Sequence, residues 1–221
     1  MKRVLFILFA FAPSILIGQN SKYCISGSLA FGKNNLEQFP VQFGKGNYQF
    51  SQKVRTIEIE IGREKVKNYL GALLQLNTSR KGIVNLNNYA FFYGDAFQIK
   101  YARILYHENR FNFCPFIKVG FQNNTFIYSN DTNHSNSNIS SGSSNEISML
   151  LTNPKGSIGV QFRYKISERS IISVFMEMSS GIISSEIKTY SNNPIGTNTF
   201  TPNFFQLGLT YTRCNEVKLV R

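Results

Sequence analysis

The sequence predicts an all-β protein: an eight-stranded antiparallel up-and-down transmembrane β-barrel with short periplasmic turns and long extracellular loops. Three observations support this prediction. Eight segments alternate between apolar and polar residues, which is the period of a β-strand with two different faces. The connections between these segments are alternately short and long. The aromatic residues on the apolar faces gather near the ends of the segments.

The alternation is clearest in Lys155–Ile166, where every second residue from Ile158 onward is apolar. The residues between them are small, polar or charged and include Arg163 and Lys165. A period of two over this length predicts a strand with one apolar and one polar face. The other seven predicted strands are approximately Tyr23–Gly32, Arg55–Gly62, Tyr69–Asn77, Ala96–Tyr106, Phe111–Phe121, Ile172–Ser179 and Phe204–Thr212.

The predicted connections differ in length at the two ends of the strands. The short ones are Arg63–Asn68, His107–Arg110 and Ser167–Arg169, and the long ones are Lys33–Val54, Thr78–Asp95, Gln122–Pro154 and Ser180–Asn203. Tight turns at one end and long loops at the other are typical of an up-and-down meander, and in outer-membrane barrels the turns are periplasmic. The loop Gln122–Pro154 is rich in Asn and Ser, which predicts mobile, surface-exposed chain.

The direction of the apolar faces distinguishes two kinds of β-protein. In a soluble barrel or sandwich the apolar face fills the core, whereas in an outer-membrane barrel it faces lipid and the polar face lines the interior. Two aromatic girdles around an aliphatic band are typical of the two membrane interfaces. One edge of the apolar faces carries the aromatic residues Tyr23, Phe111, Phe113, Tyr164 and Tyr211. The opposite edge carries Phe31, Phe97, Phe121 and Phe205. This sorting favours a membrane barrel over a soluble β-protein.

Residues 1–19 are predicted to be a secretory signal peptide. Lys2 and Arg3 precede the apolar run Val4–Ile17, and the small residue Gly18 follows it. A basic segment, an apolar segment and a small residue form the pattern of an export signal. A retained N-terminal anchor is the alternative. The barrel domain is then expected to span residues 20–221, with the protein exported to the outer membrane.

The polar faces of the predicted strands carry six charged residues that would lie inside the barrel. Counting residues from the turns gives an upper group with Glu58, Lys100, Lys118 and Glu177 and a lower group with Glu60 and Arg163. The interior of an eight-stranded barrel is just wide enough to be filled by side chains, and an unpaired buried charge is strongly destabilising. We therefore expect a network of ion pairs that plugs the lumen, with Arg163 directed toward Glu60 or another carboxylate. A charged constriction in a small pore is the alternative.

The chain contains three cysteines: Cys24, Cys114 and Cys214. Export to an oxidising compartment permits disulfides, and the odd number leaves at least one cysteine outside an intrachain pair. Cys24 begins the first predicted strand and Cys214 follows the last, and these strands are neighbours in a closed barrel. A disulfide across the barrel closure is therefore possible, with Cys114 facing inward. With only His107 and His134 the sequence holds no metal-ligand cluster, and no metal or cofactor is expected.

The chain is strongly basic, with 24 Lys and Arg residues against 12 Asp and Glu. Such a charge often indicates nucleic-acid binding, but an exported barrel is expected to meet membrane lipid and lipopolysaccharide phosphates instead. Basic residues on the predicted loops and rims include Lys33, Lys45, Lys53, Arg55, Arg80 and Lys81. A set of solvated loop charges with no specific partner is the alternative. No nucleic-acid partner is expected.

Three features carry a family resemblance: the eight alternating strands over Tyr23–Arg213, the stretch CPFIKVGF at Cys114–Phe121, and the final strand QLGLTYT at Gln206–Thr212. Together they resemble the small outer-membrane β-barrel proteins, a group with OmpA-transmembrane-domain, OmpX-like and PorT-like porin-family members. The final strand is similar to the signal read by the barrel-assembly machinery, although Arg213 stands where another apolar residue is usual. The resemblance implies a fold and a location far more than an activity.

The expected function is that of a structural or surface-interaction protein whose extracellular loops contact lipopolysaccharide, host or partner protein. A small-solute porin or channel is the alternative. Some outer-membrane lipid A deacylases and acyltransferases use a His and a Ser near that surface, and His134 and Ser135 lie on a predicted extracellular loop. Such neighbours arise by chance in a segment this rich in Ser and Asn, so the protein is not expected to be an enzyme.

Overall fold

The structure is a computed structural model, and it describes residues 21–35, 42–43, 46–47, 52–82, 88–130, 145–182, 185–186, 188–189, 199–201 and 203–216. The predicted signal peptide, residues 1–19, and His134 lie outside the described residues. Among the described residues, no helix has both the length and the apolar character needed to cross a membrane.

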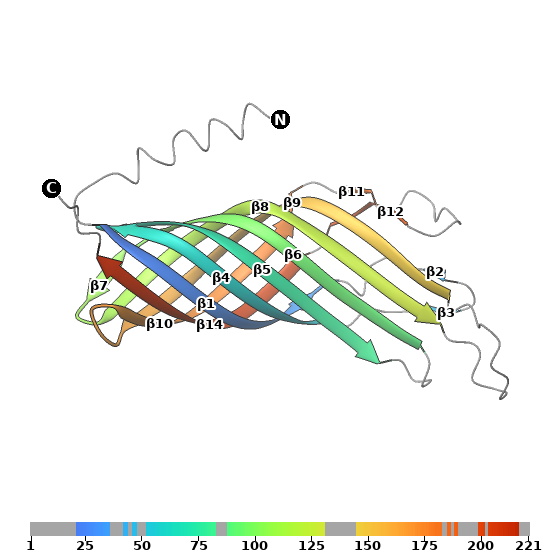
Figure 1. Ribbon diagram of the computed structural model, residues 1–221, viewed down its shortest axis with the longest axis horizontal. Helices are drawn as coiled ribbons and strands as arrows, with labels where there is room; N and C mark the ends of the chain where they lie inside the picture. The colour runs from blue at the N-terminus through green and yellow to red at the C-terminus, as the bar shows by residue number, and fades with distance from the viewer. Residues whose placement is uncertain are drawn as a thin grey trace, which may run out of the picture.

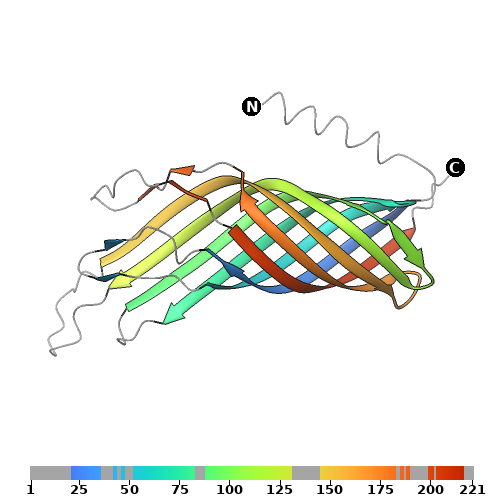
Figure 2. The ribbon, with the colours of Figure 1, turned by 180° about the vertical axis from the view of Figure 1, so that it is seen from behind.

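Eight strands form a closed antiparallel barrel, as the sequence predicted. They are β1 (Ser21–Asn34), β4 (Lys53–Lys65), β5 (Asn68–Gly82), β6 (Asn88–Arg103), β8 (Phe111–Asn130), β9 (Asn145–Lys165), β10 (Ser170–Gly181) and β14 (Asn203–Glu216). Each strand pairs with the next one along the chain, and β14 pairs with β1 to close the barrel. Figures 1 and 2 show the strands inclined to the long axis of the barrel from two opposite sides.

Six short strands lie outside this set of eight. β7 (Tyr106–Glu108) pairs with the start of β8, and β12 (Lys188–Thr189) pairs with the part of β9 near its beginning. The others form two separate pairs: β2 (Gln42–Phe43) with β3 (Gly46–Asn47), and β11 (Ser185–Glu186) with β13 (Thr199–Phe200). β7 lies at the end of the barrel with the short turns, and the remaining five lie at the opposite end (Figure 1). We call these ends the turn side and the loop side.

The exposure of the side chains confirms that the apolar faces point outward. On β4, Ile57, Ile59 and Ile61 are 51–59% exposed, whereas Glu58 and Glu60 between them are 3% and 2% exposed. The same alternation continues around the described wall. An apolar outer surface with a polar interior is the reverse of a soluble protein and fits a barrel whose surroundings are lipid.

The apolar outer band has the height that a membrane requires. On β8 it runs over eleven residues, from Phe111 to Phe121. This is roughly 33 Å along the strand and, at a tilt of about 40°, about 25 Å in height. At the turn-side end, the ring of Phe111 packs against Tyr164 on β9 at a centroid distance of 4.9 Å. The band therefore ends in aromatic residues, as membrane-spanning strands typically do.

All eight strands are longer than the sequence predicted, and β5, β6, β8 and β9 extend furthest beyond the predicted segments. β8 has 20 residues and β9 has 21, whereas β10 has 12. Much of the predicted mobile loop Gln122–Pro154 is therefore β-structure, and the predicted loop Thr78–Asp95 is shortened in the same way by β5 and β6. Beyond the membrane band the pairing is maintained by polar residues: on the outer face, Asn123 donates to Asp95 at 3.1 Å and Thr152 donates to Asn123 at 3.0 Å. These segments lack the apolar alternation by which a membrane strand is recognised.

The predicted short connections are present as tight turns. Val66, between β4 and β5, has φ 53°, and Asn109, between β7 and β8, has φ 47°. The fourth predicted strand, Ala96–Tyr106, ends three residues too late, because β6 ends at Arg103. The backbone amide of Ile104 donates to the carbonyl of Lys67 in the β4–β5 turn at 2.7 Å, which continues the β5–β6 register one position beyond the strand.

Candidate functional site in the barrel interior

Eight charged side chains pack inside the described part of the barrel. They are four carboxylates and four cations: Glu58, Glu60, Glu64, Glu177, Lys100, Lys118, Lys155 and Arg163. The period of two that turns the apolar residues outward also turns these polar positions inward. Equal numbers of opposite charges reduce the electrostatic cost of burying them together. Their contacts divide them into two tiers along the barrel axis.

The loop-side tier is centred on Lys118, which is 1% exposed. Its ammonium group donates to Glu58 Oε1 at 2.9 Å and to Glu177 Oε2 at 2.6 Å, so one cation joins two carboxylates from different strands. Gln75 Nε2 also donates to Glu58 Oε1, at 3.0 Å, and Lys155 Nζ donates to Gln75 Oε1 at 2.6 Å. These contacts link strands β4, β5, β8, β9 and β10 across the interior.

The turn-side tier consists of two separate ion pairs. Lys100 Nζ lies 3.0 Å from Glu60 Oε2, and Arg163 lies 2.6 Å from Glu64 Oε2. Each cation in this tier has its own carboxylate. The Glu64 side chain is 15% exposed, whereas those of Glu60 and Glu177 are at most 2% exposed. The second pair therefore lies closer to water.

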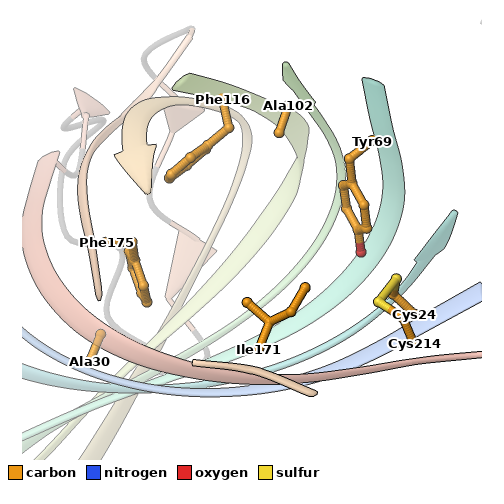
Figure 3. Packing of buried hydrophobic residues seen from close by; sticks show 8 residues of the cluster. All are labelled: Cys24, Ala30, Tyr69, Ala102, Phe116, Ile171, Phe175 and Cys214. Atoms are coloured by element: carbon orange, nitrogen blue, oxygen red, sulfur yellow. A yellow bond between two sulfur atoms is a disulfide. The ribbon is translucent and has the colours of Figure 1, made fainter. Parts of the chain in front are cut away.

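An aromatic layer lies between the tiers. The Phe116 ring has Lys100 Nζ 5.0 Å from its centroid and Lys118 Nζ 5.3 Å from it, so one ring contacts a cation of each tier. Phe175 lies 5.6 Å from Lys118 Nζ. Figure 3 shows both rings pointing into the barrel from different strands. These rings place an apolar layer across the middle of the polar interior.

Glycines on neighbouring strands make room for these rings. Gly159 is the cross-strand partner of Phe116, and Gly208 is the cross-strand partner of Phe175. A Cβ atom at either glycine would collide with the ring opposite. Gly159 lies on the polar face of the alternating segment Lys155–Ile166, and the Phe116 ring supplies the reason for a glycine there.

Register explains why Lys100 and Lys118 belong to different tiers. The two lysines are direct cross-strand partners on β6 and β8. Like charges in such positions repel each other. Lys118 extends to Glu58 and Glu177, while Lys100 reaches Glu60 on the other side of Phe116. The height count from the turns had grouped Lys100 with Lys118, and the pairing with Glu60 differs from that grouping.

The structure brings all six sequence-predicted charged residues into ion pairs and adds three residues. Arg163 pairs with Glu64 rather than with Glu60, and Glu64 lies beyond the predicted end of the second strand. Lys155 and Gln75 complete the loop-side tier. Parity alone places Lys155 inside, because it is an even number of positions from Arg163. The predicted strand begins at Lys155, and the even spacing from Arg163 is the signal in the sequence that places this lysine among the interior charges.

The turn-side mouth of the lumen is a charged cavity of about 460 Å³. Its lining includes Lys22, Glu216 and Glu64, together with Ile171 and Cys214. Lys22 and Glu216 form an ion pair of 3.6 Å across the closure between β1 and β14. The cavity therefore carries charges of both signs.

A disulfide joins Cys24 to Cys214 in the structure, beside this mouth. The two cysteines are direct cross-strand partners on β1 and β14 (Figure 3). Cys114 is a buried free cysteine and faces inward. Within the described ranges, no group of three or more His, Cys, Asp or Glu side chains has the arrangement of a metal site.

The fold is that of known outer-membrane barrels. No protein-family model matches the sequence, and no curated protein sequence matches it. The structure of a major outer membrane protein from Thermus thermophilus matches with a TM-score of 0.55 at 8% identity, over 88% of this chain and 100% of that one. Neisserial surface protein A matches with a TM-score of 0.52 at 8% identity, over 87% of this chain and 98% of that one. The chain thus has the fold of the small outer-membrane β-barrel proteins, which confirms the resemblance seen in the sequence.

Proposed function

We propose that the protein is an outer-membrane barrel with a side-chain-plugged lumen that acts as a structural or surface-interaction protein through its extracellular loops. The observation that supports the proposal is the packing of charged and aromatic side chains inside the barrel. Lys118 joins two carboxylates on one side of the Phe116 ring, and Lys100 pairs with Glu60 on the other. A continuous water column would have to displace both the ion pairs and the ring layer.

Planar-bilayer conductance of the purified barrel tests the plug. The wild-type protein is expected to give no steady large unitary currents, and such currents would overturn the proposal in favour of a small-solute channel. The double variant Phe116→Ser/Phe175→Ser serves as the positive control, because it removes both rings and keeps every ion pair. It is expected to conduct measurably more than wild type, which shows that the assay can detect an opened lumen.

The proposed location has an independent test. The mature protein is expected in outer-membrane fractions, to begin at residue 20, and to change its gel mobility on heating, as folded barrels do when they denature. N-terminal sequencing and gels of heated and unheated fractions measure these properties. Recovery of the protein in the soluble periplasm would overturn the location and, with it, the surface role.

A basic patch at the loop side supports lipopolysaccharide as a partner. Lys33 and Lys53 are direct cross-strand partners on β1 and β4, and Arg55 is the partner of Phe31. All four side chains project from the outer face, next to the aromatic edge of the apolar band. Cationic groups at this level match the phosphates of an anionic lipid headgroup, and each contributes about 1 kcal/mol of attraction near an anionic surface.

The triple variant Lys33→Gln/Lys53→Gln/Arg55→Gln tests this partner. Its affinity for lipopolysaccharide that is confined to the leaflet contacted by the loop side of asymmetric vesicles is expected to fall on the order of a hundredfold at low salt. The matched control is Lys65→Gln/Arg103→Gln/Arg213→Gln at the turn-side rim, which faces the other leaflet and is expected to keep its affinity. Equal losses in both variants would show that net charge alone governs the binding.

A further inference from the structure

A second set of basic residues encircles the turn-side rim. Arg63, Lys65, Arg103 and Arg213 occupy outward-facing strand positions, and Lys67, Arg110 and Arg169 lie in the adjoining turns. Six of the seven are exposed, and Arg63 is half-buried. They come from β4, β6, β14 and the turns beside β5, β8 and β10, so they surround the barrel. We call this set the turn-side basic ring.

The ring lies immediately beyond the aromatic girdle of the apolar band. The Arg63 guanidinium lies 5.3 Å above the Tyr23 ring, and the two residues are cross-strand partners. Arg103 and Arg213 each follow an outward-facing tyrosine, Tyr101 and Tyr211, by two positions on the same strand. Tyrosines mark the level of the lipid headgroups, and long basic side chains next to them place their charges among the headgroup phosphates.

The carboxylates near this rim do not neutralise the ring. Glu64 and Glu216 face the lumen, where they pair with Arg163 and Lys22. On the outward strand positions and turns of the described rim, the acidic residues are Glu108 and Glu168. Arg110 and Glu168 also line the charged cavity at the mouth of the lumen, and the other six basic residues against Glu108 leave a net positive outer surface at one level of the membrane.

We propose that the turn-side basic ring binds the headgroups of anionic phospholipids in the adjacent membrane leaflet. This inference rests on the membrane location proposed above. The ring has charge complementary to a phosphodiester headgroup, lies at the headgroup level, and is continuous around the wall, so it fits a shell of several lipids. Each basic side chain near an anionic lipid surface contributes about 1 kcal/mol at low ionic strength and less as salt screens the charges.

The absence of tryptophan from the sequence provides a clean test. The variant Tyr211→Trp carries a single fluorophore two residues from Arg213. The variant is reconstituted into vesicles with equal amounts of phosphatidylglycerol and phosphatidylcholine, of which one lipid is brominated in each preparation. A brominated lipid quenches the tryptophan fluorescence only when it contacts the protein near residue 211. Brominated phosphatidylglycerol is expected to associate about three- to tenfold more strongly than brominated phosphatidylcholine. At 0.5 M NaCl the preference is expected to approach one.

Two charge variants of the reporter protein separate the ring from the rest of the molecule. Arg63→Gln/Lys65→Gln/Arg103→Gln/Arg213→Gln is expected to lower the preference to near one. Lys33→Gln/Lys53→Gln/Arg55→Gln, at the opposite rim, is expected to leave it unchanged. Equal quenching of the unaltered reporter by both lipids, or equal losses in the two variants, would overturn the inference. Absence of quenching by either lipid would instead overturn the membrane location.

Discussion

The two charged tiers of the interior both bury carboxylates, but they pair them with cations in different ways. In the loop-side tier one ammonium, Lys118, holds two carboxylates, and all three side chains are at most 3% exposed. In the turn-side tier Lys100 and Arg163 each hold one carboxylate. Both tiers bury charge, but in the loop-side tier the two carboxylates share Lys118 as their ion-pair partner, while Lys155 donates to Gln75. Loss of Lys118 therefore leaves two buried carboxylates without their ion pair, whereas loss of Lys100 or Arg163 leaves one.

The largest loss of stability is expected for Lys118→Met, which removes the shared cation of the loop-side tier. The substitution leaves Glu58 and Glu177 buried without their common partner, and breaking a buried ion pair costs about 3–5 kcal/mol. We expect the free energy of unfolding to fall by at least this amount. Urea titration of the barrel folded in lipid vesicles, followed by gel mobility, measures it.

The control for Lys118→Met removes all four charges of the loop-side tier together. The variant Lys118→Met/Lys155→Met/Glu58→Gln/Glu177→Gln leaves neither a buried carboxylate nor a buried ammonium in that tier without an opposite charge, and neutral replacement of a buried ionic group is often close to neutral in stability. It is expected to recover most of the loss. If the quadruple variant is as unstable as the single one, packing rather than charge determines the effect.

The second prediction concerns the barrel closure beside the turn-side tier. Cys24 and Cys214 are 190 positions apart in sequence, and a cross-link over a long loop restricts the unfolded chain. The variant Cys24→Ser/Cys214→Ser is expected to lose about 2–4 kcal/mol of unfolding free energy under oxidising conditions, by the same urea titration. Wild type in reductant is expected to match it. The control Cys114→Ser changes a cysteine that is free in the structure and should respond to reductant as wild type does. No difference between oxidised and reduced wild type would contradict the prediction.

The sequence predicts which side chains enter the barrel better than it predicts which of them meet. Parity along each strand placed Glu58, Lys118 and Glu177 inside, because a period of two requires only local information. Pairing depends on strand tilt, register and the rings between the charges. Counting positions from the turns therefore placed Lys100 beside Lys118, although the two extend to different tiers. Glu64 was missed because the apolar alternation that defined its strand stops before it.

The third prediction compares the loss of a cation that pairs with one carboxylate with the loss of the cation that pairs with two. Arg163→Met removes the partner of one carboxylate, Glu64, which is 15% exposed and borders the charged cavity at the turn-side mouth. Because water at the mouth can solvate the remaining carboxylate, we expect a loss of about 2–3 kcal/mol, below that of Lys118→Met. The same urea titration compares the two variants. A loss equal to or above that of Lys118→Met would show that sharing the cation is not what distinguishes the tiers.

The smallest expected effect concerns the aromatic layer that keeps the tiers apart. In Gly159→Ala the new Cβ would collide with the Phe116 ring and lie 2.5 Å from the backbone oxygen of Met176. Overpacking typically costs about 1–3 kcal/mol. The Phe116 ring can rotate away but the backbone oxygen of Met176 must shift with its strand, so the free energy of unfolding should fall by about 2 kcal/mol. Adding Phe116→Leu, which shortens the side chain opposite, should restore part of the loss. It should also raise the planar-bilayer conductance, because the ring that contacts both Lys100 and Lys118 is then absent. Restored stability without a rise in conductance would separate the two roles of Phe116, leaving it a packing residue and assigning the closure of the lumen to the ion pairs alone.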